Sequence, residues 1–251
     1  MLSHEKRVGI LGLVSLAAVV SLFVIEPIAQ DPNYHQFADP RSLRGLSNFW
    51  NVVSNLPFLV VGGLGLSRYE RLSQPASAEG FRVMCWGVLL VGFGSAYYHA
   101  NPSNDTLLWD RLPMTVAFMA LFSLMLGERV LRSQNRYCLW LLVAAGVASV
   151  FYWSWTESLG RGDLRPYLLV QFLPIMLMPF ILFMFPERYL SNVLLSAAFG
   201  LYFIAKMLEY FDGRIFSVSG GTIGGHAIKH VAAAAAAFCI IYAVPARPHN
   251  C

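Results

Sequence analysis

The chain has 251 residues, of which 57% are hydrophobic and 13% are charged, and its formal net charge is +4. A soluble domain carries about a quarter charged residues, so half that fraction cannot cover the surface of a globular protein of this length. The basic residues are scattered rather than gathered in a polybasic tract, which argues against a nucleic-acid partner. A water-soluble enzyme, a nucleic-acid binder and a disordered chain are therefore excluded.

Eight apolar segments are each about as long as the hydrocarbon core of a bilayer is thick. Gly and Pro interrupt several of them, which membrane helices tolerate. The expected fold is therefore an all-α, polytopic transmembrane helical bundle, and the chain is expected to be an integral multi-pass membrane protein. The segments are residues 8–26, 46–66, 82–99, 107–127, 137–156, 165–185, 189–210 and 223–244.

The first apolar segment follows a charged cluster at residues 4–7, as the apolar region of a signal peptide does. Its apolar run is longer than that of a typical signal peptide, however, and no small-residue cleavage site follows it. We therefore expect a retained helix. The connections between segments are short, so residues 1–251 are expected to form a single membrane domain that ends in a C-terminal tail at 245–251.

The distribution of basic residues predicts an orientation in the membrane. Ten Lys and Arg residues fall on the N-terminal side of the membrane and six on the opposite side. Because cytoplasmic loops carry the excess of basic residues, both termini are expected to lie in the cytoplasm, and in a bacterium the membrane would be the plasma (inner) membrane. The ten are Lys6, Arg7, Arg68, Arg71, Arg82, Arg129, Arg132, Arg136, Arg188 and Arg247. The six are Arg41, Arg44, Arg111, Arg161, Arg165 and Arg214.

Three of the six histidines belong to predicted membrane helices, where ionisable groups are costly and often functional. His226 and His230 are four residues apart, so both imidazoles lie on one helical face, one turn apart. His99, from another helix, would give a metal ion its third ligand, and three ligands with an open fourth position are typical of catalytic zinc. The alternative is a set of hydrogen-bonded core histidines, because the H-x-x-x-H spacing alone is a weak signal.

A hydroxyl and a carboxylate lie close to His99 in the sequence. Ser95 is four residues before His99 and is therefore on the same face of its helix. Asp110 begins the next segment after a short turn, where its carboxylate could accept a proton from metal-bound water. Considered alone, Asp110 would more simply be a partner of Arg111 or a negative charge at a helix N-terminus.

Polar residues from four of the predicted helices fall toward one membrane face, opposite the termini. Polar residues that are placed independently would be divided between the two faces, so this convergence favours a single site. The residues are Asn51, Ser54, His99, Asp110, His226 and His230.

Three motifs follow one another along the chain. They are Asn48-Phe49-Trp50-Asn51-Val52-Val53-Ser54-Asn55, then Gly94-Ser95-Ala96-Tyr97-Tyr98-His99 with Asp110-Arg111-Leu112-Pro113-Met114, then His226-x-x-x-His230. Together they resemble the alkaline ceramidase family, part of a membrane hydrolase superfamily that also includes progestin and adipoQ receptors. The resemblance implies a seven-helix core at 46–244, with an additional helix and loop at 1–45.

The resemblance also implies an activity, which is zinc-dependent hydrolysis of the N-acyl amide of a membrane lipid such as ceramide, giving a fatty acid and a sphingoid base. By motif match, His99, His226 and His230 would bind Zn²⁺. Ser95 and Asp110 would be the catalytic groups beside the metal-bound water and the reacting carbonyl. The expected partner is the lipid substrate, and no protein partner is predicted.

Other polar residues are candidates for supporting the metal ligands. Asn51 and Ser54 are expected to join helices by hydrogen bonds, and a direct catalytic role is the alternative. Glu209 lies three residues from both Lys206 and Asp212, a spacing that suits an intrahelical ion pair. The functional alternative is that Glu209 or Asp212 accepts a hydrogen bond from a zinc ligand and orients it, without binding the zinc ion itself.

Eukaryotic members of the family carry an acidic calcium site before the first core helix, with a glutamate directly before Phe-Trp-Asn. Here Asn48 occupies that position, and the spacing of Asp31 and Asp39 upstream is not an obvious match. A Ca²⁺ ion is therefore doubtful.

Two other functions are open to the same residues. The first is a lipid-binding, receptor-like membrane protein on the same scaffold without turnover. The second is a b-type haem protein, which is disfavoured because histidines four residues apart on one helix cannot bind opposite faces of one haem. Retention of Ser95, Asp110 and all three histidines favours the enzyme.

Overall fold

The computed structural model describes residues 2–246, and within that range the chain folds as a bundle of helices without β-strands. Eight helical segments are long and apolar enough to cross a membrane, which confirms the all-α, multi-pass prediction. They are α1 (His4–Val24), Phe49–Arg71 with α2 (Phe49–Val53) and α3 (Leu56–Arg68), α4 (Ala78–Ala100), Asn104–Val130 with α5 (Asn104–Met125), α6 (Arg136–Ser158), α7 (Arg165–Met184), α8 (Asn192–Tyr210) and α10 (Gly225–Ala243).

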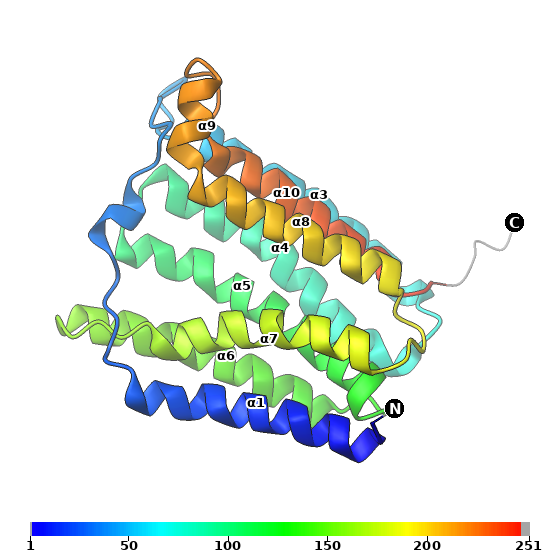
Figure 1. Ribbon diagram of the computed structural model, residues 1–251. Coiled ribbons are helices and arrows are strands. Elements are labelled where there is room, and N and C mark those ends of the chain that lie inside the picture. Colours follow the sequence, from blue (N-terminus) through cyan, green and yellow to red (C-terminus); the bar gives the residue numbers. More distant parts are fainter. Residues whose placement is uncertain (1, 247–251) are drawn as a thin grey trace, which may run out of the picture.

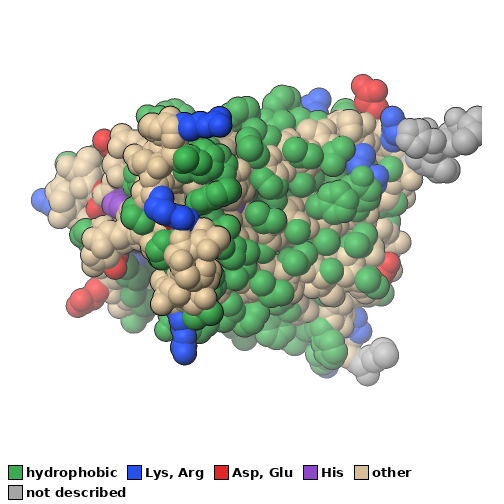
Figure 2. Space-filling view, turned by 90° about the horizontal axis from the view of Figure 1, so that it is seen from above, with side chains coloured by type: hydrophobic (Ala, Val, Ile, Leu, Met, Phe, Trp, Pro, Cys, Tyr) green, Lys and Arg blue, Asp and Glu red, His purple; other side chains and the backbone are tan. Residues whose placement is uncertain are grey.

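The spanning helices lie side by side, with α1 at one edge beside α7 (Figure 1). A space-filling view shows hydrophobic side chains across the middle of the molecule and most charged side chains toward its two ends (Figure 2). This distribution fits a hydrocarbon layer across the middle of the helices. The orientation of the termini stays a prediction, and of the tail expected at 245–251 only residues 245 and 246 lie within the described range.

Two local features differ from the expected segments. The helix expected at 46–66 begins at Phe49 and is broken between α2 and α3, where Pro57 lies in the first turn of α3 and lacks the N–H that a continuous helix would need. A short helix that the hydropathy did not predict, α9 (Asp212–Val218), follows α8. Gly220 and Gly221 end it with φ angles of +65° and +75°, which favour glycine.

Close packing of α4 against α5 brings their polar residues together. A Cβ atom at Gly94 would collide with the backbone carbonyl of Trp109, so only glycine allows this approach. Ser95 follows Gly94 on α4, and Asp110 follows Trp109 on α5. The two polar residues are therefore neighbours because the helix axes come so close at this point.

The loop between α1 and α2, residues 25–48, which we call the covering loop, runs across one end of the bundle (Figure 1). Its backbone is held at several points: the N–H of Gln30 donates to Glu157 Oε1 at 2.6 Å, and the N–H of Ala38 donates to Asp212 Oδ2 at 3.0 Å. This is the end at which α4 finishes and α10 begins, so the loop covers the face toward which the sequence places the site.

Candidate metal centre

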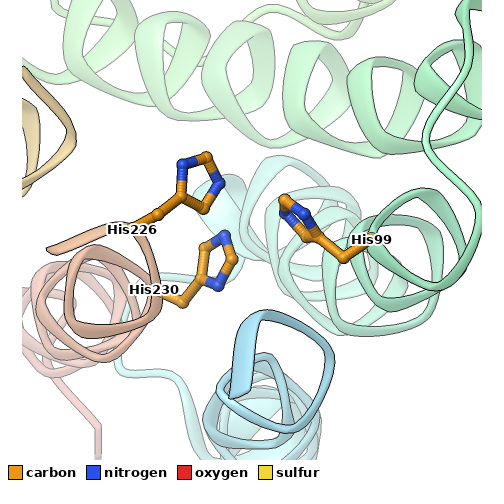
Figure 3. A group of neighbouring side chains, drawn as sticks. All are labelled: His99, His226 and His230. Atoms are coloured by element: carbon orange, nitrogen blue, oxygen red, sulfur yellow. The ribbon is translucent and has the colours of Figure 1, made fainter. Parts of the chain in front are cut away.

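Three histidines meet at the covered end of the bundle (Figure 3). His99 lies in the last turn of α4, and His226 and His230 lie in the first two turns of α10. All three are buried, and one nitrogen from each ring lies within 4.8 Å of the others. The ring of His99 is centred 4.8 Å from each of the other two. The structure therefore brings together the three ligands that sequence reasoning proposed.

The hydrogen bonding of these rings fits a metal ion. His99 Nδ1 and His226 Nε2 are buried and have no hydrogen-bond partner among the described residues. A buried polar atom without a partner costs free energy, and a metal ion is a partner that both imidazoles could share. The alternative of hydrogen-bonded core histidines requires partners that these two nitrogens lack. The group could hold a metal ion, and its donor set of three imidazoles suits zinc.

Contacts with α8 and α9 fix the start of α10. Asp212 Oδ1 accepts a hydrogen bond from the backbone N–H of His226 at 2.9 Å. Gly225 is packed so closely against the backbone carbonyl of Leu208 that a side chain would not fit. Asp212 thus acts on the backbone of a histidine rather than on its ring, and the supporting role suggested by the sequence stays a prediction.

His230 is held by Ser54, which lies in the break between α2 and α3. Its Nδ1 is 2.8 Å from Ser54 Oγ, so Nε2 is the nitrogen left free for a metal. The Ser54 hydroxyl donates its own hydrogen to the backbone carbonyl of Asn51, so it accepts the Nδ1 hydrogen of His230. Asn51 itself is fully buried, and its Nδ2 donates to the carbonyl of Asp39 at 3.3 Å. Ser54 and Asn51 therefore connect α10, the helix break after α2, and the covering loop.

We predict that Ser54→Ala weakens metal binding without unfolding the protein. Groups that orient a metal-bound histidine typically contribute about 10- to 100-fold in metal affinity or activity. Competition with a chelator of known affinity measures the change. Ser67→Ala is the matched control, because Ser67 also donates to the carbonyl three residues earlier but is exposed on α3. Equal zinc affinity in the two variants would contradict the predicted role of Ser54.

A cavity of about 530 Å³ opens beside the histidines. Ser95, Asp110 and all three histidines line it, and most of its other lining side chains are apolar. Along α5 the lining runs from Asp110 to Met125, a rise of about 22 Å at 1.5 Å per residue. A long apolar chain could therefore lie along α5 with its polar end beside the histidines.

The carboxyl of Asp110 faces this cavity from the second turn of α5. It is buried, it has Ser95 as a neighbour, and its Oδ1 has no hydrogen-bond partner among the described residues. The alternative that it pairs with Arg111 finds no support, because Arg111 donates instead to Gln30 Oε1 at 2.6 Å. The Oδ1 atom of Asp110 is therefore available to act on a ligand in the cavity.

Three charged residues of α8 and α10 form one cluster on the cavity wall. Glu209 is bound by both Lys206 and Lys229. The pair of Lys206 with Glu209 matches the intrahelical ion pair that its spacing predicts. Sequence reasoning missed the role of Lys229, although an ionisable residue beside His230 in a membrane helix is itself a signal of function.

Residues of the covering loop also touch the site and were not predicted. The Phe37 ring is centred 4.7 Å from the rings of both His99 and His226. Asn48 Nδ2 donates to the backbone carbonyl of His99 at 3.0 Å. Isolated residues in a loop carry no periodic pattern, so the sequence offered no signal for Phe37.

The two acidic residues considered for calcium are engaged with the chain itself. Asp39 is buried and binds Arg41 through both oxygens, at 2.7 and 2.6 Å. Asp31 Oδ1 accepts the backbone N–H of Asn33 at 2.9 Å and begins a short 3₁₀ helix, Pro32–His35. Neither carboxylate belongs to the histidine group, which is the candidate metal site found in the described part of the chain.

Comparison with known proteins gives one family. The family model described as Ceramidase matches residues 43–178, which is just over half of the chain. The matched region runs from the end of the covering loop into α7, and so contains Ser95, His99 and Asp110 but not the two histidines of α10. None of the curated proteins matches the chain.

Proposed function

Because this chain belongs to the ceramidase family, we propose that it is a zinc-dependent amidase that acts within the membrane. Its substrate would be a ceramide-like lipid, and the products would be a fatty acid and a long-chain amine, a sphingoid base in the case of ceramide. The observation that carries this proposal is the convergence of three imidazoles, one carboxyl and one hydroxyl on a single apolar cavity.

His99, His226 and His230 would hold the zinc ion. Three imidazole ligands leave a fourth position open, as in catalytic zinc sites. The chemistry that zinc supplies in such a site is Lewis-acid activation of water and of a carbonyl oxygen. Phe37, which packs on two of the three rings, would exclude bulk water from this position.

Asp110 and Ser95 would carry out the proton transfer and the charge stabilisation. The Asp110 carboxylate accepts a proton from the attacking water and passes it to the leaving nitrogen as the C–N bond breaks. The Ser95 hydroxyl donates to the carbonyl oxygen as negative charge develops on it, a contribution of about 3–4 kcal/mol per donor in comparable sites. Both residues line the cavity with the histidines.

The apolar part of the cavity would hold the acyl chain. Its walls on α5 include Met114, Phe118, Leu121 and Met125 in succession, a stripe with helical spacing. A lipid amide is dissolved in the bilayer, so an intramembrane cavity would receive it sideways from the lipid. With both termini in the cytoplasm, as the basic residues predict, the site would lie toward the opposite face of the membrane.

A fatty-acid release assay over a panel of lipid amides tests the proposal. We expect the purified, zinc-loaded protein to release fatty acid, a chelator to abolish the release, and added Zn²⁺ to restore it. Absence of release from every amide, with zinc bound and the fold intact, would contradict the enzyme and favour the receptor-like alternative. A haem would show as a visible absorption band in the purified protein.

A further inference from the structure

Arg111 is a buried cation in the wall of the cavity. Its side chain is about 5% exposed, and none of the ion pairs in the described part of the chain includes it. The neighbouring Asp110 interacts with it electrostatically but forms no direct ion pair with it, and a buried charge without a direct ion-pair partner is costly and destabilises the fold. In a membrane helix such a residue marks a functional site more often than a structural one.

Aromatic rings hold the Arg111 guanidinium in place but do not neutralise it. Its Cζ lies 4.1 Å from the ring centroid of Trp153 and 4.5 Å from that of Tyr167, within the range of cation–π contacts. Nη2 donates to Gln30 Oε1, whereas Nη1 is buried and has no hydrogen-bond partner among the described residues. The N–H donors of Nη1 are therefore unused among the described residues.

A short chain of contacts links Arg111 to the metal centre. Its Cζ lies 5.7 Å from the ring of Tyr34 in the covering loop. The Tyr98 hydroxyl donates to the Tyr34 carbonyl at 3.5 Å, and the Tyr98 ring is centred 4.9 Å from that of His99. Arg111 and the histidines line the same cavity. One ligand could therefore touch both.

The other charged groups on the cavity wall are already engaged. Glu209 is bound by two lysines, and Asp31 is exposed and bonded to the backbone of its own loop. Asp110 has the proton-transfer role in the proposed reaction. Lys206 and Lys229 also line the cavity, and both are paired with Glu209. Arg111 is thus the cation of this wall that takes part in no ion pair among the described residues, and it lies at the polar end of the cavity, beneath the loop.

We propose that Arg111 binds a carboxylate on the amine half of the substrate, which is then an N-acyl amino acid rather than a neutral ceramide. This inference rests on the proposed amidase function and names its substrate class. The acyl half of an intact amide is uncharged and fits the apolar wall, so the charge must come from the amine half. A guanidinium fork matches a carboxylate in shape and charge.

The reaction remains an ordinary hydrolysis. The acyl carbon gains the hydroxyl of water, the C–N bond breaks, and the nitrogen gains the proton. The products are a fatty acid and an amino acid, and no oxidant, reductant or further reactant is needed.

A matched pair of substrates tests this inference. N-Palmitoylglycine and N-palmitoylethanolamine share the acyl chain and the amide, but only the first carries a carboxylate. We expect the zinc-loaded protein to hydrolyse N-palmitoylglycine with a kcat/KM at least about tenfold higher, the scale of one charge-assisted hydrogen bond. Equal rates on the two would overturn the inference and leave the amidase intact. No release from either, or from ceramide, would instead contradict the proposed function.

The variant Arg111→Gln tests whether Arg111 causes the preference for a substrate with a carboxylate. We expect kcat/KM for N-palmitoylglycine to fall about 10- to 100-fold, and that for N-palmitoylethanolamine to change by less than about threefold. Arg214→Gln, an exposed residue on α9, is the matched control. If Arg111→Gln does not fold, the test uses Arg111→Lys together with the wild-type preference for N-palmitoylglycine. Lys keeps the charge but not the fork, so Arg111→Lys should show a smaller preference than the wild type. If only inhibition by free palmitate is lost, Arg111 binds the fatty-acid product and the substrate assignment is wrong.

Discussion

Replacement of His226 by alanine is expected to remove bound zinc and to lower fatty-acid release at least about a thousandfold. His226 contributes one of three ring nitrogens that lie within 4.8 Å of one another. A metal bound by only two imidazoles loses both affinity and the geometry of the open fourth position. Lewis-acid activation contributes several kcal/mol, and each 1.36 kcal/mol changes the rate tenfold. Metal analysis of the purified variant, together with the release assay, measures both effects.

His4→Ala is the matched control for that experiment. His4 begins α1, and its ring packs on Phe185 near the end of α7, away from the cavity. This variant should retain zinc and activity. If His226→Ala retained a full equivalent of zinc, the metal assignment would be wrong. If it lost zinc but kept its activity, the histidines would be structural and the amidase mechanism would have to be sought elsewhere.

The membrane helices could be predicted because their signal is carried by many residues at once. Eight long apolar blocks leave few other folds for a chain with so little charge. The break between α2 and α3 and the short helix α9 were missed for the opposite reason. Each depends on one or two residues, such as Pro57 and Gly220, whose effect is local and does not change the mean hydropathy of a segment.

The histidine group could be predicted from spacing and topology together. His226 and His230 are four positions apart, so both lie on one face of the helix, and the order of the helices places His99 at the same end of the bundle. The surroundings of Arg111 could not be predicted, because Trp153 and Tyr167 come from two other helices whose rotation the sequence does not specify. Loop contacts escaped prediction for a similar reason, since no periodic pattern restricts them.

Asp110→Asn separates proton transfer from metal binding. The substitution keeps the size of the side chain but removes its capacity to accept a proton, so kcat should fall about 10²- to 10⁴-fold. Zinc content should stay at the wild-type level, because Asp110 does not belong to the histidine group. KM should change little, since the apolar walls that would hold the acyl chain are unaltered. Steady-state kinetics and metal analysis on the same preparation measure all three quantities.

Asp105→Asn is the matched control, since Asp105 is exposed in the first turn of α5, five residues before Asp110. It should behave as the wild type. Full activity in Asp110→Asn would remove the proton-transfer role and leave the unpartnered Oδ1 of Asp110 without a function. Loss of both zinc and activity would show that Asp110 stabilises the centre instead of acting on the substrate. Only loss of kcat with zinc retained fits a carboxylate that carries the proton from water to the leaving nitrogen.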